Sequence, residues 1–372
     1  MNKIASRIQT RSSNRTKEYK ILIIQPILAR DLSAKRFESF LMKIIPQPLF
    51  TKRKAVIVTF NLLLFTCLLY WLFHNINFQD LITQIKNAPP KAIIAGLLIN
   101  IMVLIAYSKR LSIISGADFA PCFLITTLGF TFNSLAPFRI GEAIKIYFGK
   151  KRFNYSIGAL SASILIEKIY DIISLVIFSI IIITNIGMQI IDLKIIISLC
   201  VIIFFGVVCI MVIRTKRELI YDKIKETFIF KKIITYNLFS SNDLRVFDHK
   251  IISAALLTAF IWLTNTTLIF ILFSLLIPDA DLSLFSAAIL LIIAALAIAI
   301  PGTPAGIGIF EAGIVSYLIN FYNIDKEQAL SSAFIYHLVI TTPHTLIILF
   351  YIVISFFKED DLRKQLWKRV ID

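Results

Sequence analysis

The sequence is poor in charged residues. Only 17% of its 372 residues are Asp, Glu, Lys or Arg, and 58% are hydrophobic, whereas about a quarter of a typical soluble domain is charged. Whole stretches such as 251–278 carry no charged side chain. This composition argues against a soluble enzyme, a disordered chain or a nucleic-acid-binding protein. It predicts an all-α polytopic membrane protein.

The sequence also lacks the motifs of common metal sites, disulfide frameworks and catalytic centres. The cysteines lie in apolar runs without a CxxC pair or a nearby histidine cluster, so neither a disulfide framework nor a zinc site is predicted. They are Cys67, Cys122, Cys200 and Cys209. The sequence has no GxxxxGK[ST] loop for ATP phosphates and no HExxH, GxSxG or aspartate-rich motif. We therefore expect no metal, no cofactor, no direct use of ATP and no enzymatic activity.

Hydrophobic runs of about 20 residues, the length that crosses ~30 Å of hydrocarbon, recur along the chain. We expect about eight crossings, at 54–74, 91–108, 156–184, 190–213, 250–277, 284–300, 307–322 and 329–357. A further run, 119–136, is followed at once by a proline and charged residues, so we expect it to be re-entrant. The transmembrane domain then occupies 51–357, between a basic, poorly ordered arm (1–50) and a tail (358–372).

The net charge of +16 is distributed unevenly. Eight crossings put both termini on one side together with 109–118, 137–152 and the connector 214–250, and this side holds 34 Lys and Arg against four on the other. Without the nine basic residues before Phe37 the ratio is 25 to 4. Basic residues gather in cytoplasmic loops, so we expect cytoplasmic termini and an inner-membrane location. Translation from Met42, which would remove the arm, is an equally good hypothesis.

A first polar cluster follows the re-entrant segment. It contains Asn133, Pro137, Arg139, Gly141, Glu142 and Lys145. Pro137 cannot continue a helix, so a new helix should begin just after it, with Arg139 and Glu142 one turn apart on one face. Free amides at a helix start and a guanidinium are suited to a phosphate. The alternative is an interfacial helix whose charges lie at headgroup level.

A second polar cluster lies inside an apolar span. Glu167 and Asp171 are four residues apart, so two carboxylates share a helix face and need compensating positive charge. Lys168 points about 100° away, which leaves Arg139 or Lys145 as the candidates. The alternative is a structural ion pair near the cytoplasmic end of the helix.

A third cluster has two prolines and four glycines within 301–313. Its candidate residues are Pro301, Pro304, Gly306, Gly308 and Glu311. The bilayer hydrocarbon offers no hydrogen-bond partners for backbone N–H and C=O groups outside a regular helix. This break should therefore line a cavity or be buried in protein. It mirrors the first break, as paired interruptions do in transporters. Close helix packing would explain the glycines but not Glu311. His337 and His344 are seven residues apart, too far for chelation on one helix, and should pack or line the cavity.

The three clusters read NSLAPFRIGE (133–142), EKIYD (167–171) and PGTPAGIGIFEAG (301–313). Together they resemble the flippase-like transmembrane domain family of lysylphosphatidylglycerol synthase, over roughly 54–357. The resemblance implies broken or re-entrant helices around a central polar cavity for a lipid headgroup. It also implies functional roles for Arg139, Glu142, Glu167, Asp171 and Glu311. Because the chain stops about fifteen residues past its last span, without the synthase's soluble aminoacyl-transferase domain, we expect no aminoacylation of lipid.

These features predict a transporter that moves or presents a lipid or lipid-linked headgroup, of phospholipid or polyprenyl-phosphate type, with membrane lipids as partners. Arg139 would contact the phosphate and Glu142 would orient it, while the other carboxylates would shape a polar path or exchange protons. The alternative is a non-transporting accessory protein that binds lipid-linked sugars or anchors a glycosyltransferase or other lipid-modifying enzyme. The transport hypothesis requires the two broken stretches to face each other around a shared polar pocket. It fails if Arg139, Glu167 and Glu311 lie far apart and reach water separately, with solid helix packing between them.

Overall fold

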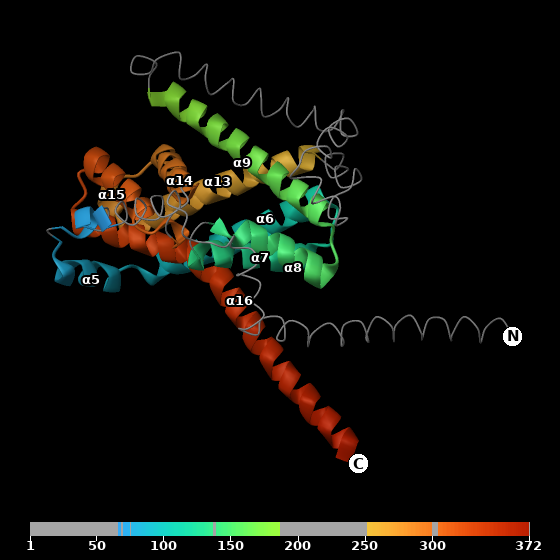
Figure 1. Ribbon diagram of the computed structural model, residues 1–372. Helices are drawn as coiled ribbons and strands as arrows, with labels where there is room; N and C mark the ends of the chain where they lie inside the picture. The colour runs from blue at the N-terminus through green and yellow to red at the C-terminus, as the bar shows by residue number, and fades with distance from the viewer. Residues whose placement is uncertain are drawn as a thin grey trace, which may run out of the picture. The chain divides into compact units, whose positions relative to one another are not determined.

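Figure 1 shows the computed structural model of the chain. It describes 66–67, 70–74, 76–136, 139–186, 251–299 and 304–371, and side chains only up to residue 354. The predicted crossing 190–213, the connector 214–250, the basic arm and most of 54–74 lie outside these residues. The chain divides into two compact units, 1–59 with 346–372, and 60–345. The second unit holds most of the described residues.

The described part of the chain is built from helices and turns, without a strand. The helices are α5 (Phe78–Lys86), α6 (Pro90–Ser115), α7 (Phe119–Leu135), α8 (Gly141–Phe153), α9 (Ile157–Ile186), α13 (Ile251–Leu276), α14 (Leu284–Ala299), α15 (Ile309–Tyr322) and α16 (Lys326–Ile371), with short 3₁₀ turns η3 (Pro278–Ala280) and η4 (Pro304–Gly306). Pro90–Ser115, Ile252–Leu276 and Lys326–Ile354 are long and apolar enough to cross a bilayer, and α7, α14 and α15 are shorter apolar helices. The all-α membrane architecture is confirmed.

Helix α6 is longer than the crossing predicted at 91–108. It begins with Pro90 in the first turn, where a missing N–H costs nothing, and ends before Gly116, whose φ of 68° is left-handed. Its last turns therefore include Arg110, which we had placed in a cytoplasmic loop. Arg110 is 1% exposed, so it does not belong in the count of loop charges.

Helices α7 and α8 form a hairpin, the shape expected of a re-entrant segment. At about 1.5 Å per residue, the 17 residues of α7 span ~25 Å. Gly141, at the start of α8, faces Gly129 so closely that a Cβ on Gly141 would lie 2.0 Å from the Gly129 carbonyl oxygen. Gly149, two turns further on, lies beside Ile125. The α8 helix thus runs back along α7, with glycines allowing the close approach.

The second break is also present. Ala305, Gly306 and Gly308 have φ values of 52°, 77° and 91°, so the chain turns through left-handed conformations that glycine tolerates and other residues rarely adopt. Glu311 closes the turn because its carboxylate accepts a hydrogen bond from the Gly308 N–H. Helix α15 starts from this fixed point.

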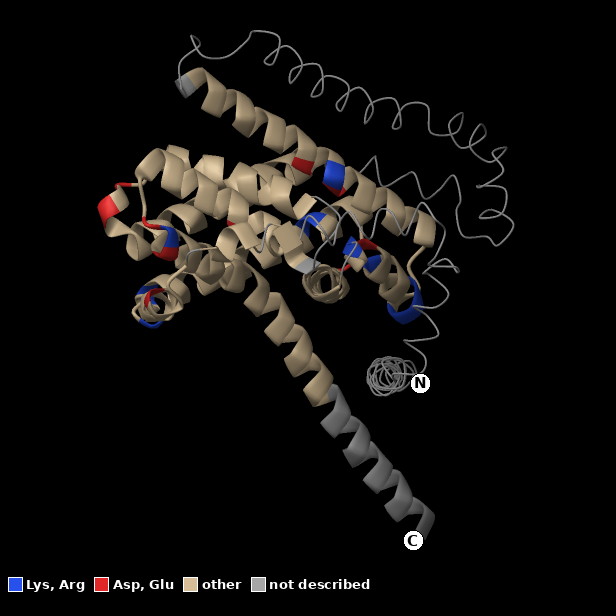
Figure 2. Cartoon of the chain, turned by 60° about the vertical axis from the view of Figure 1, so that its left-hand side comes forward, with Lys and Arg blue, Asp and Glu red and all other residues tan. Residues whose placement is uncertain are grey.

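The main apolar core joins α13, α14, α15 and α16. Leu272, Leu290, Phe310 and Leu330, one from each helix, are fully buried in it. Figure 2 shows that charged residues are sparse along the helices, with one group on α9. The short helix α5 was not predicted. It presents Phe78, Ile82 and Ile85 to the exterior, and its nine residues are too few to give a hydrophobic run.

Candidate functional site

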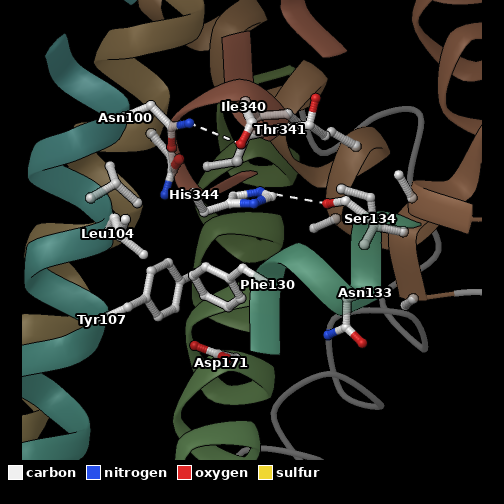
Figure 3. A pocket seen from close by; sticks show the side chains of 18 of the residues that line it. Asn100, Leu104, Tyr107, Phe130, Asn133, Ser134, Asp171, Ile340, Thr341 and His344 are labelled. Atoms are coloured by element: carbon white, nitrogen blue, oxygen red, sulfur yellow. Dashed lines mark hydrogen bonds between the residues drawn. The ribbon is translucent and has the colours of Figure 1, made fainter. Parts of the chain in front are cut away.

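A cavity of about 410 Å³ lies among α6, α7, α9, α13, α14 and α16 and reaches both breaks. Its wall is mainly apolar and aromatic, and Figure 3 shows the rings of Tyr107 and Phe130 together in it. The polar and charged residues of the wall include Asn100, Asn133, Ser134, Arg139, Glu142, Lys168, Asp171, Asn265, His337, Thr341 and His344. An apolar wall with a few polar groups is typical of a ligand-binding cavity.

Two of the wall residues are positively charged and partly exposed. Arg139 is 33% exposed and Lys168 is 41% exposed. The Lys168 Nζ lies 3.2 Å from Glu142 Oε1, and the Arg139 Nη2 lies 4.0 Å from the same oxygen. One carboxylate therefore faces two cations that a ligand in the cavity can reach.

Arg139 also connects the two breaks. Its Nη1 donates to the carbonyl oxygen of Ile298, near the end of α14, at 2.7 Å. Arg139 has a φ of 51°, a left-handed conformation that is uncommon for a residue with a side chain. Ala305 of η4 lines the same cavity. The two breaks thus meet at one wall, as the paired interruptions predicted.

Asn133 holds the start of α8. Its Oδ1 accepts from the Gly141 N–H at 2.7 Å, and its Nδ2 donates to Glu142 Oε2 at 3.3 Å. The Gly141 amide is therefore not free for a phosphate, which corrects one part of our expectation for this helix start. Burial opposes ionisation of Glu142, but Lys168, with Lys145 and Arg139, holds the pKa of Glu142 below its ordinary value.

Behind the cavity wall lies a buried network of four charges. Arg110 forms a two-pronged pair with Asp171, at 2.7 and 3.3 Å, and donates to Thr258 Oγ1 at 3.1 Å. Glu167 lies between two cations, 3.6 Å from Arg110 Nε and 3.5 Å from Lys145 Nζ. Two positive and two negative charges balance, and together they join α6, α8 and α9, with Thr258 adding α13.

The network corrects the predicted partners of the two carboxylates. Lys145 does compensate Glu167, as one of the two candidates. Arg139 does not, because its guanidinium points to Glu142 and Ile298. Arg110 supplies most of the compensation and was missed. Helix end signals at Pro90 and Gly116 could have shown that Arg110 lies inside the helix.

Glu311 is 1% exposed and does not line the cavity. Its Oε2 accepts from the Gly308 N–H at 2.7 Å, and its Oε1 contacts Nδ1 of His337. His337 does line the cavity. The three residues expected to share a cavity are therefore arranged in two layers. Arg139 lies at the cavity wall. Glu167 lies behind the wall, linked to the wall residue Asp171 through the buried network, and Glu311 lies behind the wall, linked to the wall residue His337.

Residues 58–348 match the family described as the lysylphosphatidylglycerol synthase TM region. The chain belongs to this family. The match contains all three polar clusters and confirms the resemblance drawn from them. No curated protein matches the chain. Membership in the lysylphosphatidylglycerol synthase TM family makes this a membrane protein of lipid metabolism or translocation.

The other candidate residues of this family member contribute to the shape of the site. Gly141 allows the hairpin to close, and Gly306 and Gly308 provide the turn before α15. Pro137, Pro301 and the side chain of Pro304 lie outside the described residues. Their direct part in binding, like that of Asn133 and the charged residues, stays a prediction.

The described part of the chain holds no group of three His, Cys, Asp or Glu side chains placed to bind a metal ion. His337 and His344 both line the cavity. Both nitrogens of His344 meet hydroxyl groups, Nδ1 with Thr131 at 3.4 Å and Nε2 with Ser134 at 3.5 Å, the latter drawn in Figure 3. Neither Cys122, which is buried, nor Cys67, which is exposed, forms a disulfide.

Proposed function

We propose that this protein translocates a lipid or lipid-linked headgroup, of phospholipid or polyprenyl-phosphate type, across the cytoplasmic membrane without using ATP. The observation that carries the proposal is the cavity, whose largely apolar wall presents Arg139 and Lys168 beside a single carboxylate. A guanidinium can hold two phosphate oxygens at once, and an ammonium adds a point charge. The hydrocarbon chains stay in the bilayer.

An arriving phosphate would exchange places with Glu142. Without a ligand, Glu142 is the anionic partner of both Lys168 and Arg139. A phosphate oxygen that takes over these cations replaces one anion by another, so neither cation is left without a counter-charge in an apolar wall. The Glu142 side chain, 24% exposed, has room to turn away.

The buried network supplies a fixed support for this exchange. Arg110, Asp171, Glu167 and Lys145 are paired with one another, and Arg110 is sealed from the cavity. Only Asp171, 25% exposed, reaches the wall. The buried cations Arg110 and Lys145 therefore keep their carboxylate partners. The wall cations Arg139 and Lys168 can exchange Glu142 for a phosphate.

The proposal includes cytoplasmic termini and an inner-membrane location, supported by the excess of basic residues on one predicted side. It includes no catalytic step. The lipid itself is the proposed partner.

The test is a lipid-scrambling assay in vesicles of phosphatidylethanolamine and phosphatidylglycerol that contain fluorescent phosphatidylglycerol. Wild-type protein should expose inner-leaflet probe to an impermeant quencher, and Arg139→Ala should reduce the rate towards that of protein-free vesicles. Lys150→Ala is the matched control, because Lys150 is an exposed cation of the same helix region. Equal rates for folded Arg139→Ala and wild type would refute the assigned role.

A second outcome leads to the accessory function. If the wild type moves no lipid in pure vesicles yet keeps lipid through gentle purification, it presents a lipid to another protein. Purification together with a glycosyltransferase or other lipid-modifying enzyme would then identify the partner.

A further inference from the structure

Glu311 and His337 form a buried pair that the headgroup contacts proposed above do not use. Glu311 is on α15, at the second break, and His337 is on α16. An ionised carboxylate only accepts hydrogen bonds. With Glu311 ionised, its carboxylate accepts from the Gly308 N–H and from His337, and the Nδ1 of His337 then carries the proton of their bond.

The second ring nitrogen of His337 is the one available to a ligand. The ring packs on Phe310 with centroids 4.6 Å apart, and its Nδ1 is held by Glu311. No described residue forms a hydrogen bond with Nε2. Nε2 is also not one of the fully buried polar atoms that lack a partner, so part of its surface is accessible. Since His337 lines the cavity, Nε2 opens into it.

The protonation of Nε2 determines whether His337 repels an anion in the cavity or donates a hydrogen bond to it. A neutral His337 with its proton on Nδ1 presents a lone pair at Nε2, which repels an oxyanion. Uptake of one proton at Nε2 turns this acceptor into a donor and changes the pair from one negative charge to none. Histidine is the side chain suited to this change near neutral pH.

The charges around the cavity balance when His337 is neutral. Cations and carboxylates come from α6, the α7–α8 hairpin, α9 and α15, whereas α13 and α14 contribute no titratable side chain. The cations are Arg110, Arg139, Lys145 and Lys168, and the carboxylates are Glu142, Glu167, Asp171 and Glu311. The neutral titratable groups on these elements are Tyr107, Cys122, Tyr147, Tyr170, Tyr317 and Tyr322, and α16 adds Tyr336 and His344 at the cavity wall. Four positive charges meet four negative ones, so a bound phosphodiester adds one uncompensated negative charge.

We infer that the Glu311–His337 pair is a proton-binding site of the cavity, and that one proton enters it from solution when a monoanionic phosphodiester headgroup binds. The inference rests on the proposed function and adds the coupling ion to it. The proton restores charge balance, and the new Nε2–H donates to the phosphate. Loss of the proton on the other side of the membrane would favour release.

Calorimetric titration of the purified full-length protein with dihexanoyl phosphatidylglycerol, in buffers of different ionisation enthalpy, measures protons taken up per bound probe. We expect uptake approaching one proton at mildly alkaline pH, with Kd rising up to about tenfold per pH unit. His337→Gln should bind with no uptake and a flat Kd. His74→Gln, which changes an exposed histidine outside the cavity wall, should keep the wild-type uptake.

Glu311→Gln is the second variant, for the case in which His337→Gln does not fold. The Gln oxygen still accepts from Gly308, and its amide donates to Nδ1, which holds the His337 proton on Nε2. Binding should persist while proton uptake is lost. Binding without uptake by the wild type, or uptake unchanged in His337→Gln or Glu311→Gln, overturns the inference and leaves the proposed function standing. If the probe does not bind the wild type, the inference falls, whereas the proposed function is decided by the scrambling assay.

Discussion

The side-chain amide of Asn100 on α6 donates to the carbonyl oxygens of Val339 and Ile340 on α16, each at 2.9 Å. Val339 lies four residues before Pro343, so its carbonyl is the one that the missing proline N–H leaves without a helical partner. Asn100 is buried. It therefore satisfies a carbonyl that apolar surroundings would otherwise leave unpaired, and it fixes α6 against α16 at the cavity.

Asn100→Leu should destabilise the protein by about 1–3 kcal/mol, the cost of leaving a buried polar group without a partner. Adding Pro343→Ala should recover much of that loss, because the new N–H can donate to Val339. Thermal unfolding of the detergent-purified variants measures both effects. Asn320→Leu, which removes an exposed asparagine amide bonded within its own helix, should change the unfolding temperature little. A double variant no more stable than Asn100→Leu contradicts this account.

Arg110→Met should be strongly destabilising. It leaves Asp171 without its ion-pair partner and Glu167 with Lys145 alone, and breaking a buried pair by removing one partner costs about 3–5 kcal/mol. Adding Asp171→Asn should cost less than the sum of the two single changes, which a double-mutant cycle of unfolding free energies measures.

The neighbouring lysine provides the control for Arg110. Lys109→Met removes a positive charge one residue away, but Lys109 is exposed, so the unfolding temperature should stay close to that of the wild type. A similar fall in unfolding temperature for Lys109→Met and Arg110→Met would mean that the buried ion pairs of Arg110 do not stabilise the fold.

The sequence was sufficient for features that depend on local chemistry. A proline beside charged residues predicted the turn between α7 and α8, and paired glycines and prolines predicted the break before α15. The helix-end signals at Pro90 and Gly116 could place Arg110 inside α6 but could not predict its burial, because that depends on Asp171, which is 61 residues away in the chain. An arginine at the end of an apolar run is equally typical of a loop, so the predicted crossing stopped too early.

The two-layer arrangement of the site was also beyond sequence reasoning. Glu311 was predicted to face the cavity because a carboxylate in an apolar break needs polar surroundings. Its surroundings are instead the Gly308 amide and His337, and the histidine faces the cavity in its place. Helical spacing along α16 places His337 on a face, but only the packing of α15 against α16 brings Glu311 to it.

Gly141→Ala should disrupt the α7–α8 hairpin. The new Cβ would lie 2.0 Å from a backbone oxygen of Gly129 and 2.6 Å from the Asn133 side chain that caps the same helix, so the helices must separate. Gly313→Ala is the matched change, since its Cβ would meet a side-chain methyl, Cγ2 of Ile293, at 2.6 Å and no backbone atom. Gly313→Ala also gains about 1 kcal/mol in helix propensity, because Gly313 lies in the interior of α15. We expect a much lower unfolding temperature for the first, and equal values would contradict the close approach.

Lys168→Met should weaken binding of dihexanoyl phosphatidylglycerol by about tenfold or more, because a hydrogen bond to a charged group contributes about 1.5–3 kcal/mol. Its unfolding temperature should change little, since Lys168 is 41% exposed and Glu142 keeps Arg139 and Asn133 as partners. Lys168→Arg, which retains the charge, should bind within a few-fold of the wild type. Lys151→Met provides an exposed lysine outside the cavity wall as the control. Unchanged affinity in folded Lys168→Met would exclude this lysine as a phosphate contact and leave Arg139 as the cation of the wall to be tested.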